Sequence, residues 1–434
     1  MDRAARRNRT RTRTPIVRLL SPLRDFLSTE ASGAILLAAG AVIALVWANS
    51  PWSSSYEDLW TSKAAVSVAG HVLELDLRHW INDGLMTVFF LVVGLEIKRE
   101  LTDGHLATKR AALLPAAAAI GGMVVPALVY LAIAGSTAPR GWAIPMATDI
   151  ALAVGVLAVA GRRVPASMRA FLLGLAIVDD IGAIVIIAAV YSTGLQFGWL
   201  AAGTAGVVAV VALRRLGVYS SAAYVVLGVF VWFSFHEAGI HPTIAGVVMG
   251  LLAPSTPRLQ RELIDADELV DLSDADAART TSELARGSVS VVEWLQHVLH
   301  PWTSYLIVPV FALANSGISI SASGVRDAVG SPITWGVVFG LLAGKPLGVV
   351  VATRLAVRSG AADAPEHSTP RHVLGIGTAA GIGFTVALFI TELALTDADD
   401  RSHAKLAILV SSVIAALAAS AILRLRDASS NSVN

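Results

Sequence analysis

The chain has 434 residues, of which 55% are hydrophobic and only 15% are charged, whereas soluble domains carry about 25% charged residues. This composition excludes an ordinary water-soluble fold. The chain contains no cysteine, which excludes a disulfide framework, a thiolate metal site and a cysteine nucleophile. A formal net charge of +1 gives no indication of an acidic partner.

The apolar residues fall into blocks of about 20, the length of helix that crosses the hydrocarbon core of a bilayer. Twelve blocks are predicted to be transmembrane helices. They are residues 31–49, 81–97, 112–134, 142–160, 168–192, 196–213, 219–235, 239–254, 291–318, 332–353, 372–395 and 403–424. We interpret the first block as an uncleaved span, because it is too long for a signal peptide and lacks a small-residue cleavage site.

Positive charge is distributed unevenly among the connections between these spans. Of the 33 Lys and Arg residues, 26 lie on the side of the two termini, six lie on the other side, and Lys345 lies inside a span. Because Lys and Arg collect on the cytoplasmic side, we expect both termini to be cytoplasmic. The basic tail, residues 1–27, is expected to lie beside anionic lipid headgroups, with nucleic-acid binding as the alternative.

Two connections differ from simple loops. In residues 64–78, apolar side chains alternate with small or polar ones around Gly70, a pattern typical of a short β-hairpin. An irregular loop fits the same pattern about equally well. A hairpin there would lie on the periplasmic side and offer edges for pairing between subunits. Residues 255–290 carry eight acidic residues and few large apolar ones, so we expect a solvated cytoplasmic loop.

Four ionisable residues lie inside predicted spans, namely Asp149, Asp179, Asp180 and Lys345. Each costs at least a few kcal/mol at the bilayer centre, so each needs a partner or a function. Asp179 and Asp180 are flanked by unbroken apolar sequence in LAIVDDIGAIVII. Consecutive helical residues point about 100° apart, so the two carboxylates should have different roles. The alternative is a purely structural pair satisfied by Ser, Thr or backbone donors.

The chemistry of this pair favours ion exchange. Two adjacent carboxylates repel each other and titrate as a coupled unit, so the pair can carry a proton. The same oxygens are hard ligands that suit a small hard cation such as Na+ or Li+. Competition between proton and cation for one site is sufficient for exchange. Lys345, in LLAGKPLG, is a natural counter-charge for the pair, and snorkelling to a helix end is the alternative.

Two spans are predicted to be interrupted. Pro145 removes a backbone hydrogen bond just before Thr148 and Asp149 in GWAIPMATDIALAVG, and Gly381 and Gly383 interrupt TAAGIGFTVALFI. Broken helices at corresponding positions of two halves indicate the binding site of a transporter. Glycine also serves ordinary helix packing in membranes, so this pattern is not decisive by itself.

Other polar residues lie near span ends. Histidine changes charge near physiological pH and can act as a switch, but a histidine at a span end is also a common interfacial residue. The residues of this kind are Asp83, Glu96, Glu100, His241, His297 and His300.

Long segments of the chain resemble the NhaA-type sodium/proton antiporters. They are WINDGLMTVFFLVVGLEIKREL, GWAIPMATDIALAVGVLA, LAIVDDIGAIVIIA, HVLHPWTSYLIVPVFALANSGI, GKPLG and GIGFT, in order within residues 28–425. The resemblance implies an all-α polytopic membrane protein with twelve transmembrane helices, inverted repeats and two discontinuous crossing helices. It implies a core of spans 3–5 and 10–12, and an interface part of spans 1, 2, 8 and 9 with hairpin 64–78, which joins a homodimer. Residues 426–434 would be a C-terminal tail.

The resemblance also implies roles for individual residues. Asp180 and Asp179, with Thr148 nearby, would carry the transported Na+ and H+, Lys345 would pair with Asp179, and Asp149 and Lys345 would balance the half-helix dipoles. A cytoplasmic-side pH-sensing and funnel region or its neighbourhood would contain Glu96, Glu100, His241, His297 and His300, with Asp83 as a further candidate. The sequence departs from the family in Gln296, where a Glu is expected, in the acidic connection and in the basic tail.

We therefore expect a secondary Na+/H+ antiporter of the bacterial inner membrane, not an enzyme and without a cofactor. It would export Na+ and Li+ in exchange for external protons, for pH and sodium homeostasis, and would be electrogenic. Its partners would be these ions, membrane lipid and a second copy of the chain. One alternative is a related-fold cation transporter with different ion coupling. Others are an intramembrane aspartyl protease, disfavoured because Gly381 and Gly383 precede Phe384 and Thr385 and not a GxGD pattern, and a transport-inactive scaffold.

Overall fold

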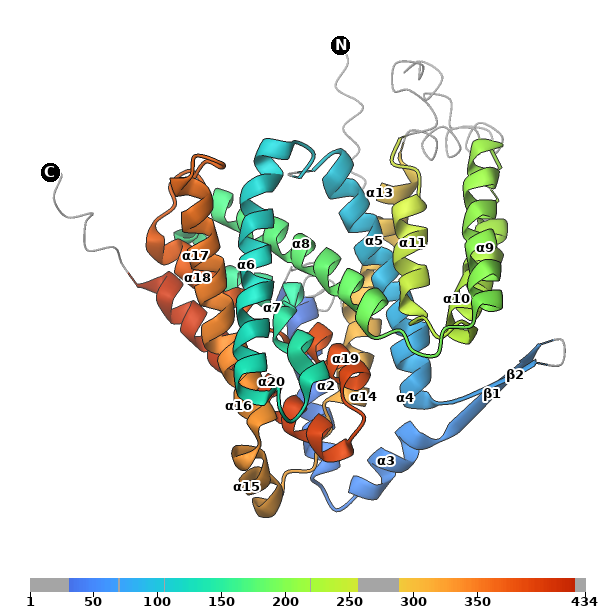
Figure 1. Ribbon diagram of the computed structural model, residues 1–434, viewed down its shortest axis with the longest axis horizontal. Helices are drawn as coiled ribbons and strands as arrows, with labels where there is room; N and C mark the ends of the chain where they lie inside the picture. The colour runs from blue at the N-terminus through green and yellow to red at the C-terminus, as the bar shows by residue number, and fades with distance from the viewer. Residues whose placement is uncertain (1–30, 69–70, 105, 219, 257–288, 426–434) are drawn as a thin grey trace, which may run out of the picture.

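The computed structural model describes residues 31–68, 71–104, 106–218, 220–256 and 289–425. Within these ranges the protein is almost entirely helical, with one two-stranded sheet (Figure 1). The basic tail, most of the acidic connection and the C-terminal tail lie outside the described residues.

The first half of the described chain runs from α2 to α11. Its elements are α2 (Ala31–Ala48), α3 (Ser53–Thr61), β1 (Lys63–Val68), β2 (His71–Asp76), α4 (Leu77–His79), η1 (Trp80–Leu85), α5 (Met86–Thr102), α6 (Lys109–Ala134), η2 (Pro139–Met146), α7 (Ile150–Ala160), η3 (Gly161–Arg163), α8 (Ala166–Val190), α9 (Phe197–Arg215), α10 (Ser221–Glu237) and α11 (Thr243–Leu252).

The second half runs from α13 to α20. Its elements are α13 (Val291–Trp302), η6 (Thr303–Ile307), α14 (Val308–Asn315), α15 (Ala322–Gly330), α16 (Pro332–Phe339), η7 (Gly340–Gly344), α17 (Lys345–Arg358), α18 (Pro370–Ala380), α19 (Phe384–Ala394) and α20 (Ala398–Arg424). The segments η1, η6 and η7 are π-helical turns that join α-helical segments, and η2 is a 3₁₀-helix.

Eight helices among the described residues are long and apolar enough to cross a membrane. Two bent pairs, α2 with α3 at 115° and α18 with α19 at 45°, raise the number to ten if each pair is one span. The shorter apolar helices α10 and α11 account for the two remaining predicted blocks. All twelve predicted blocks therefore coincide with helix, and the chain is a multi-pass membrane protein.

The hairpin prediction is confirmed. Strands β1 and β2 pair antiparallel, from Lys63 opposite Asp76 to Val68 opposite His71. The hairpin projects away from the helices in Figure 1, and Val66 and Val72 are exposed on it. Such an isolated ribbon has little packing of its own.

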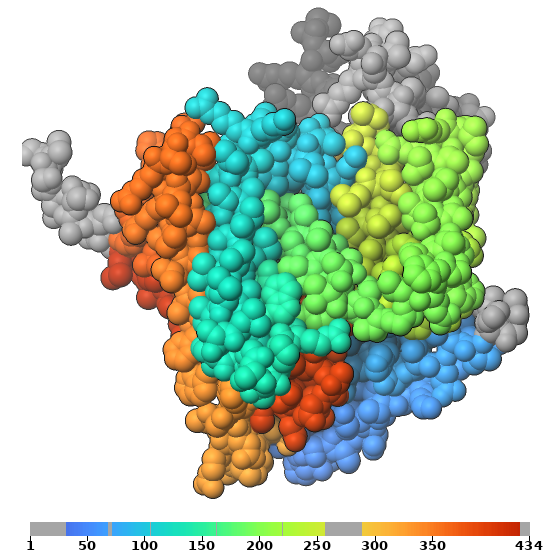
Figure 2. All heavy atoms as spheres, in the orientation of Figure 1, coloured from blue at the N-terminus to red at the C-terminus, as the bar shows by residue number. Residues whose placement is uncertain are grey.

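Small residues let the central helices approach closely. A Cβ added to Gly121 on α6 would collide with the carbonyl oxygen of Gly348 on α17, and one added to Gly348 would collide with Gly121. In a membrane, where lipid is as apolar as the helix surface, such close packing holds helices together. Helices α9 and α10 lie at one edge of the molecule and α17 and α18 near the opposite edge, with α6, α7 and α8 between them (Figures 1 and 2).

Candidate ion-binding site

The two interrupted spans meet at their breaks. The chain leaves helical geometry between η2 and α7, at residues 147–149, and between α18 and α19, at residues 381–383. The backbone N–H of Asp149 donates to the carbonyl of Ile382 over 2.6 Å, and Thr148 Oγ1 lies 3.0 Å from the carbonyl oxygen of Ala380. Each break thus satisfies backbone groups that the other leaves unpaired, a requirement in a region without water.

The carboxylate of Asp149 caps two helices at once. Its Oδ1 accepts from the backbone N–H of Leu152 in the first turn of α7, over 3.0 Å. Its Oδ2 accepts from Thr385 at the start of α19, from the backbone N–H over 3.1 Å and from Oγ1 over 2.7 Å. A negative charge is favourable at helix N-termini because the helix dipole is positive there. Asp149 therefore neutralises two positive helix ends that face each other.

Lys345 supplies the opposite charge and is fully buried. Its Nζ donates to the carbonyl of Met146, the last residue of η2, and to Asp179 Oδ2. The C-terminal end of a helix carries partial negative charge, so the ammonium group is well placed at η2. The π-helical turn η7 directly precedes Lys345, and such turns are frequent at functional sites.

The adjacent carboxylates on α8 have different surroundings. Asp179 Oδ2 accepts from Lys345 and from Thr148 Oγ1, the latter over 2.6 Å. Asp179 Oδ1 is buried without a hydrogen-bond partner among the described residues. Asp180 is only 6% exposed and forms no hydrogen bond or ion pair with the described part of the chain. Because α8 is helical throughout, the two carboxylates point in different directions, as the sequence predicted.

The oxygen atoms of Asp179, Asp180 and Thr148 are suited to bind a cation. Asp179 Oδ1 and the Asp180 carboxylate are buried acceptors without a donor among the described residues, a costly arrangement unless a proton or a cation occupies them. The Thr148 hydroxyl carries one hydrogen, so it bonds either Asp179 or Ala380 at a given moment and keeps a lone pair for a further ligand. Oxygen ligands of this kind suit a small hard cation.

Comparison with known proteins decides the family. Residues 24–423 match the model of the family described as Na+/H+ antiporter 1. The chain belongs to this family. It is 47% identical over 425 residues to Na(+)/H(+) antiporter NhaA 2 of Sorangium cellulosum, covering 94% of this chain and 90% of the relative. It is 46% identical over 413 residues to Na(+)/H(+) antiporter NhaA of Cupriavidus necator, covering 91% of this chain and 88% of the relative. The resemblance inferred from the motifs is therefore confirmed.

A solved structure supports the fold of this family member. The sodium proton antiporter MjNhaP1 from Methanocaldococcus jannaschii aligns with a TM-score of 0.50 over 94% of this chain and 93% of that chain. The sequence identity is 13%, so this likeness concerns the fold alone.

A second polar cluster in this Na+/H+ antiporter 1 family member lies at the hairpin end. His241 Nε2 is 3.4 Å from Asp83 Oδ1, and His236 Nδ1 is 4.0 Å from Asp83 Oδ2. The indole of Trp232 donates to the carbonyl of Asp83 over 2.9 Å and stacks on His236. Asp83 and His241 were each predicted from the sequence as candidate residues, but His236 was not. Its position was nevertheless visible, because His236 and His241 flank the short turn in FHEAGIHP.

The remaining predicted residues lie elsewhere. Glu96 is half-buried on α5 and interacts electrostatically with Asp180, and Glu100 follows one turn later. His297 and His300 are exposed on α13. The structure thus brings His241 together with Asp83, just before α5, and not with Glu96 and Glu100 toward the end of that helix. Successive antiparallel spans put alternate connections at opposite ends, so the turn between α10 and α11 lies with the start of α5 and not with its end.

Proposed function

We propose that this chain is a secondary active antiporter that exports Na+, and also Li+, in exchange for external protons. The observation that carries the proposal is the buried pair Asp179 and Asp180 beside the meeting point of two broken helices. In the part of the chain that the structure describes, carboxylate oxygens of this pair have no hydrogen-bond donor. The names of the relatives, which are Na+/H+ antiporters, support the same exchange.

The exchange would work by competition at one site. Asp180, which is without a protein partner in the described chain, binds either a proton or the cation. Asp179 is the second ligand, and its charge is balanced by Lys345. Thr148 holds Asp179 Oδ2 and adds a hydroxyl ligand. Because proton and Na+ occupy the same oxygens, lowering the pH on one side reduces the apparent affinity for Na+ on that side. No nucleotide or other cofactor takes part.

Release on alternate sides requires that the site be reached from each side in turn. We propose twelve transmembrane helices, with α10 and α11 crossing as well. The alternation of Lys and Arg between connections is consistent with this count, because it would fail if only one of the two helices crossed. Inverted repeats would relate spans 3–5 to spans 10–12, each with one broken helix. More than one proton for each Na+ would make the exchange electrogenic and serve pH and sodium homeostasis.

We further propose that both termini are cytoplasmic, in the inner membrane of a bacterium, which places the hairpin in the periplasm. Basic residues near the membrane would contact anionic lipid. The exposed hairpin would pair with the hairpin of a second copy, because two strands alone leave both edges open.

The decisive experiment replaces Asp180 with Asn in everted membrane vesicles. Addition of Na+, Li+ or K+ is followed by proton movement across the vesicle membrane. We expect the wild-type protein to respond to Na+ and Li+, and Asp180→Asn to show no response although the assembled protein is present. Asp363→Asn is the matched control, because Asp363 pairs with Arg110 on the exposed surface. Exchange retained in Asp180→Asn would overturn the mechanism, and a response to K+ alone would favour the alternative of different ion coupling.

A further inference from the structure

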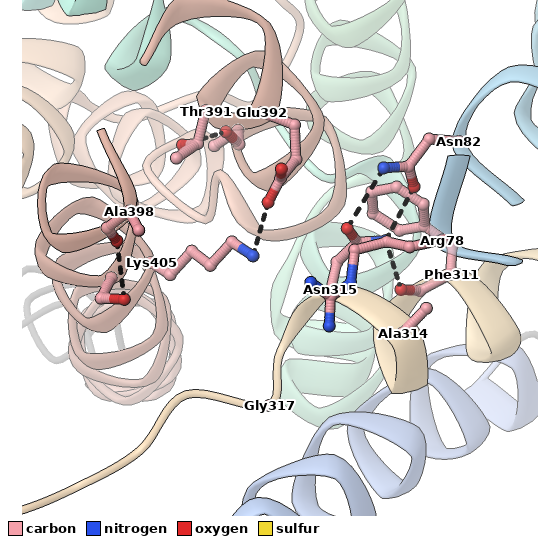
Figure 3. Close-up of polar contacts among 12 residues, drawn as sticks. Arg78, Asn82, Phe311, Ala314, Asn315, Gly317, Thr391, Glu392, Ala398 and Lys405 are labelled. Carbon is pink, nitrogen blue, oxygen red and sulfur yellow. Dashed lines mark hydrogen bonds and ion pairs between the residues drawn. The ribbon is translucent and has the colours of Figure 1, made fainter. Parts of the chain in front are cut away.

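A second buried ion pair lies away from the proposed ion site. Glu392 on α19 and Lys405 on α20 are 2.5 Å apart, and their side chains are only 16% and 10% exposed. Figure 3 shows the two side chains reaching toward each other from the two helices. Removing such charges from water is costly, so a buried pair is poor evidence for added stability and calls for another explanation.

Arg78 faces this pair from a different part of the molecule. Its guanidinium group on α4 forms two hydrogen bonds with Glu57 on α3, over 3.2 and 3.0 Å. The positive charge of Arg78 also attracts Glu392 and repels Lys405. Charges in poorly solvated surroundings interact more strongly than in water. Glu392 is therefore paired with Lys405 of the neighbouring helix α20 and is also attracted by Arg78 of α4. Figure 3 shows the three side chains.

The position of this cluster along α19 relates it to the ion site. Thr385, which contacts Asp149, lies seven residues before Glu392, or about 10 Å along the helix axis. Between them, the ring of Phe389 packs on Phe90 of α5 and Phe311 of α14, with ring centres 5.5 and 6.3 Å apart. Along α19 from the hairpin end toward the site, the charged cluster therefore comes first and the aromatic layer second.

We propose that Arg78, Glu392 and Lys405 form an electrostatic latch that holds the hairpin end of the transporter closed. The latch joins α19 and α20, of the expected core, to α4, of the expected interface part. Alternating access requires these parts to move against each other, so the latch must open when the site faces the hairpin side. The inference rests on the proposed function for its role in transport, but the closure of the hairpin end can be tested without transport.

The test uses the absence of cysteine from the chain. Ala387→Cys introduces a single thiol at a fully buried position of α19, between the ion site and the latch. Its rate of labelling by a membrane-impermeant maleimide added on the hairpin side reports opening. Adding Arg78→Gln should raise this rate roughly tenfold, which corresponds to about 1.4 kcal/mol in the opening equilibrium. Arg78→Lys retains the charge and should stay near the parent rate. Glu57, which loses its partner in Arg78→Gln, is 56% exposed, so folding should suffer little.

A second variant removes the latch from its other side. Glu392→Gln with Lys405→Met deletes both charges together and leaves no unpaired buried charge, and it should also raise labelling. Lys63→Gln, which breaks only the exposed pair with Glu74 on the hairpin, should leave labelling unchanged. Labelling that stays at the parent rate in both latch variants would overturn the proposal. Increased labelling in a protein that exchanges no ions would support the latch and refute the proposed function.

Discussion

Thr148 Oγ1 lies 2.6 Å from Asp179 Oδ2, although the two residues belong to different spans. Thr148 occupies the break before α7, where the backbone is free to turn its hydroxyl toward α8. The contact fixes one carboxylate oxygen of Asp179 and leaves the other without a donor among the described residues. The broken helix therefore positions one of the two carboxylates through a side chain, and not only through its dipole.

Replacing Thr148 with Val should weaken cation binding. The substitution keeps the shape but removes the hydroxyl, so Asp179 loses a hydrogen bond and the cation loses a ligand. A buried hydrogen bond to a charged group contributes about 1.5–3 kcal/mol, so we expect the apparent Na+ affinity to fall roughly tenfold or more. Thr148→Ser should remain near wild type. The Na+ concentration for half-maximal exchange measures this, and equal values in Val and wild-type proteins would contradict the assignment.

Replacing Lys345 with Met should destabilise the protein, because it leaves Asp179 as a buried charge without its ion-pair partner. Breaking one side of such a pair costs about 3–5 kcal/mol. We expect a lower midpoint of thermal unfolding in detergent. The double variant Lys345→Met with Asp179→Asn should regain much of that midpoint while exchange stays absent. If Lys345→Met alone were as stable as wild type, the ion pair would not contribute to the stability of the protein.

Replacing Asp149 with Ala should loosen the starts of both α7 and α19. The carboxylate accepts from the backbone N–H groups of Leu152 and Thr385, and each lost cap costs about 0.5–2 kcal/mol. We expect faster hydrogen exchange at these two amides, with little change in the middle of α8. Asp149→Asn, which retains one carbonyl acceptor, should fall between Ala and wild type. Faster exchange at only one of the two amides would argue against a shared cap.

Replacing Val66 and Val72 with Lys should separate the proposed dimer. Lysine on an exposed strand blocks edge-to-edge pairing, because its charge would have to be buried. Light scattering of the protein in detergent should give the mass of a dimer for the wild type and of a monomer for the variant. Val329→Lys on α15 is a matched control, since Val329 is also exposed but lies outside the hairpin. A dimeric hairpin variant would place the interface elsewhere.

Local features of the fold were predictable from the sequence. The twelve apolar blocks coincide with helices, and eight of the described helices are long and apolar enough to cross a membrane. Bilayer thickness sets that length, and it is visible in a single stretch of chain. The interruptions at residues 147–149 and 381–383 were predictable because Pro and Gly act on their own backbone. The sequence did not decide between a hairpin and an irregular loop, because alternation over a few residues fits both. The pairing of β1 with β2 shows that the segment is a hairpin.

The sequence by itself determined which charges must be explained: Asp149, Asp179, Asp180 and Lys345 stand in apolar sequence, where hydrocarbon cannot solvate them. Only the tertiary structure decided their partners. Asp149 meets Thr385 across 236 positions, and Lys345 meets Asp179 across 166. Such contacts depend on how helices cross, and no local pattern encodes a crossing. For the same reason the sequence did not reveal the contact of His241 with Asp83 or the pair of Glu392 and Lys405.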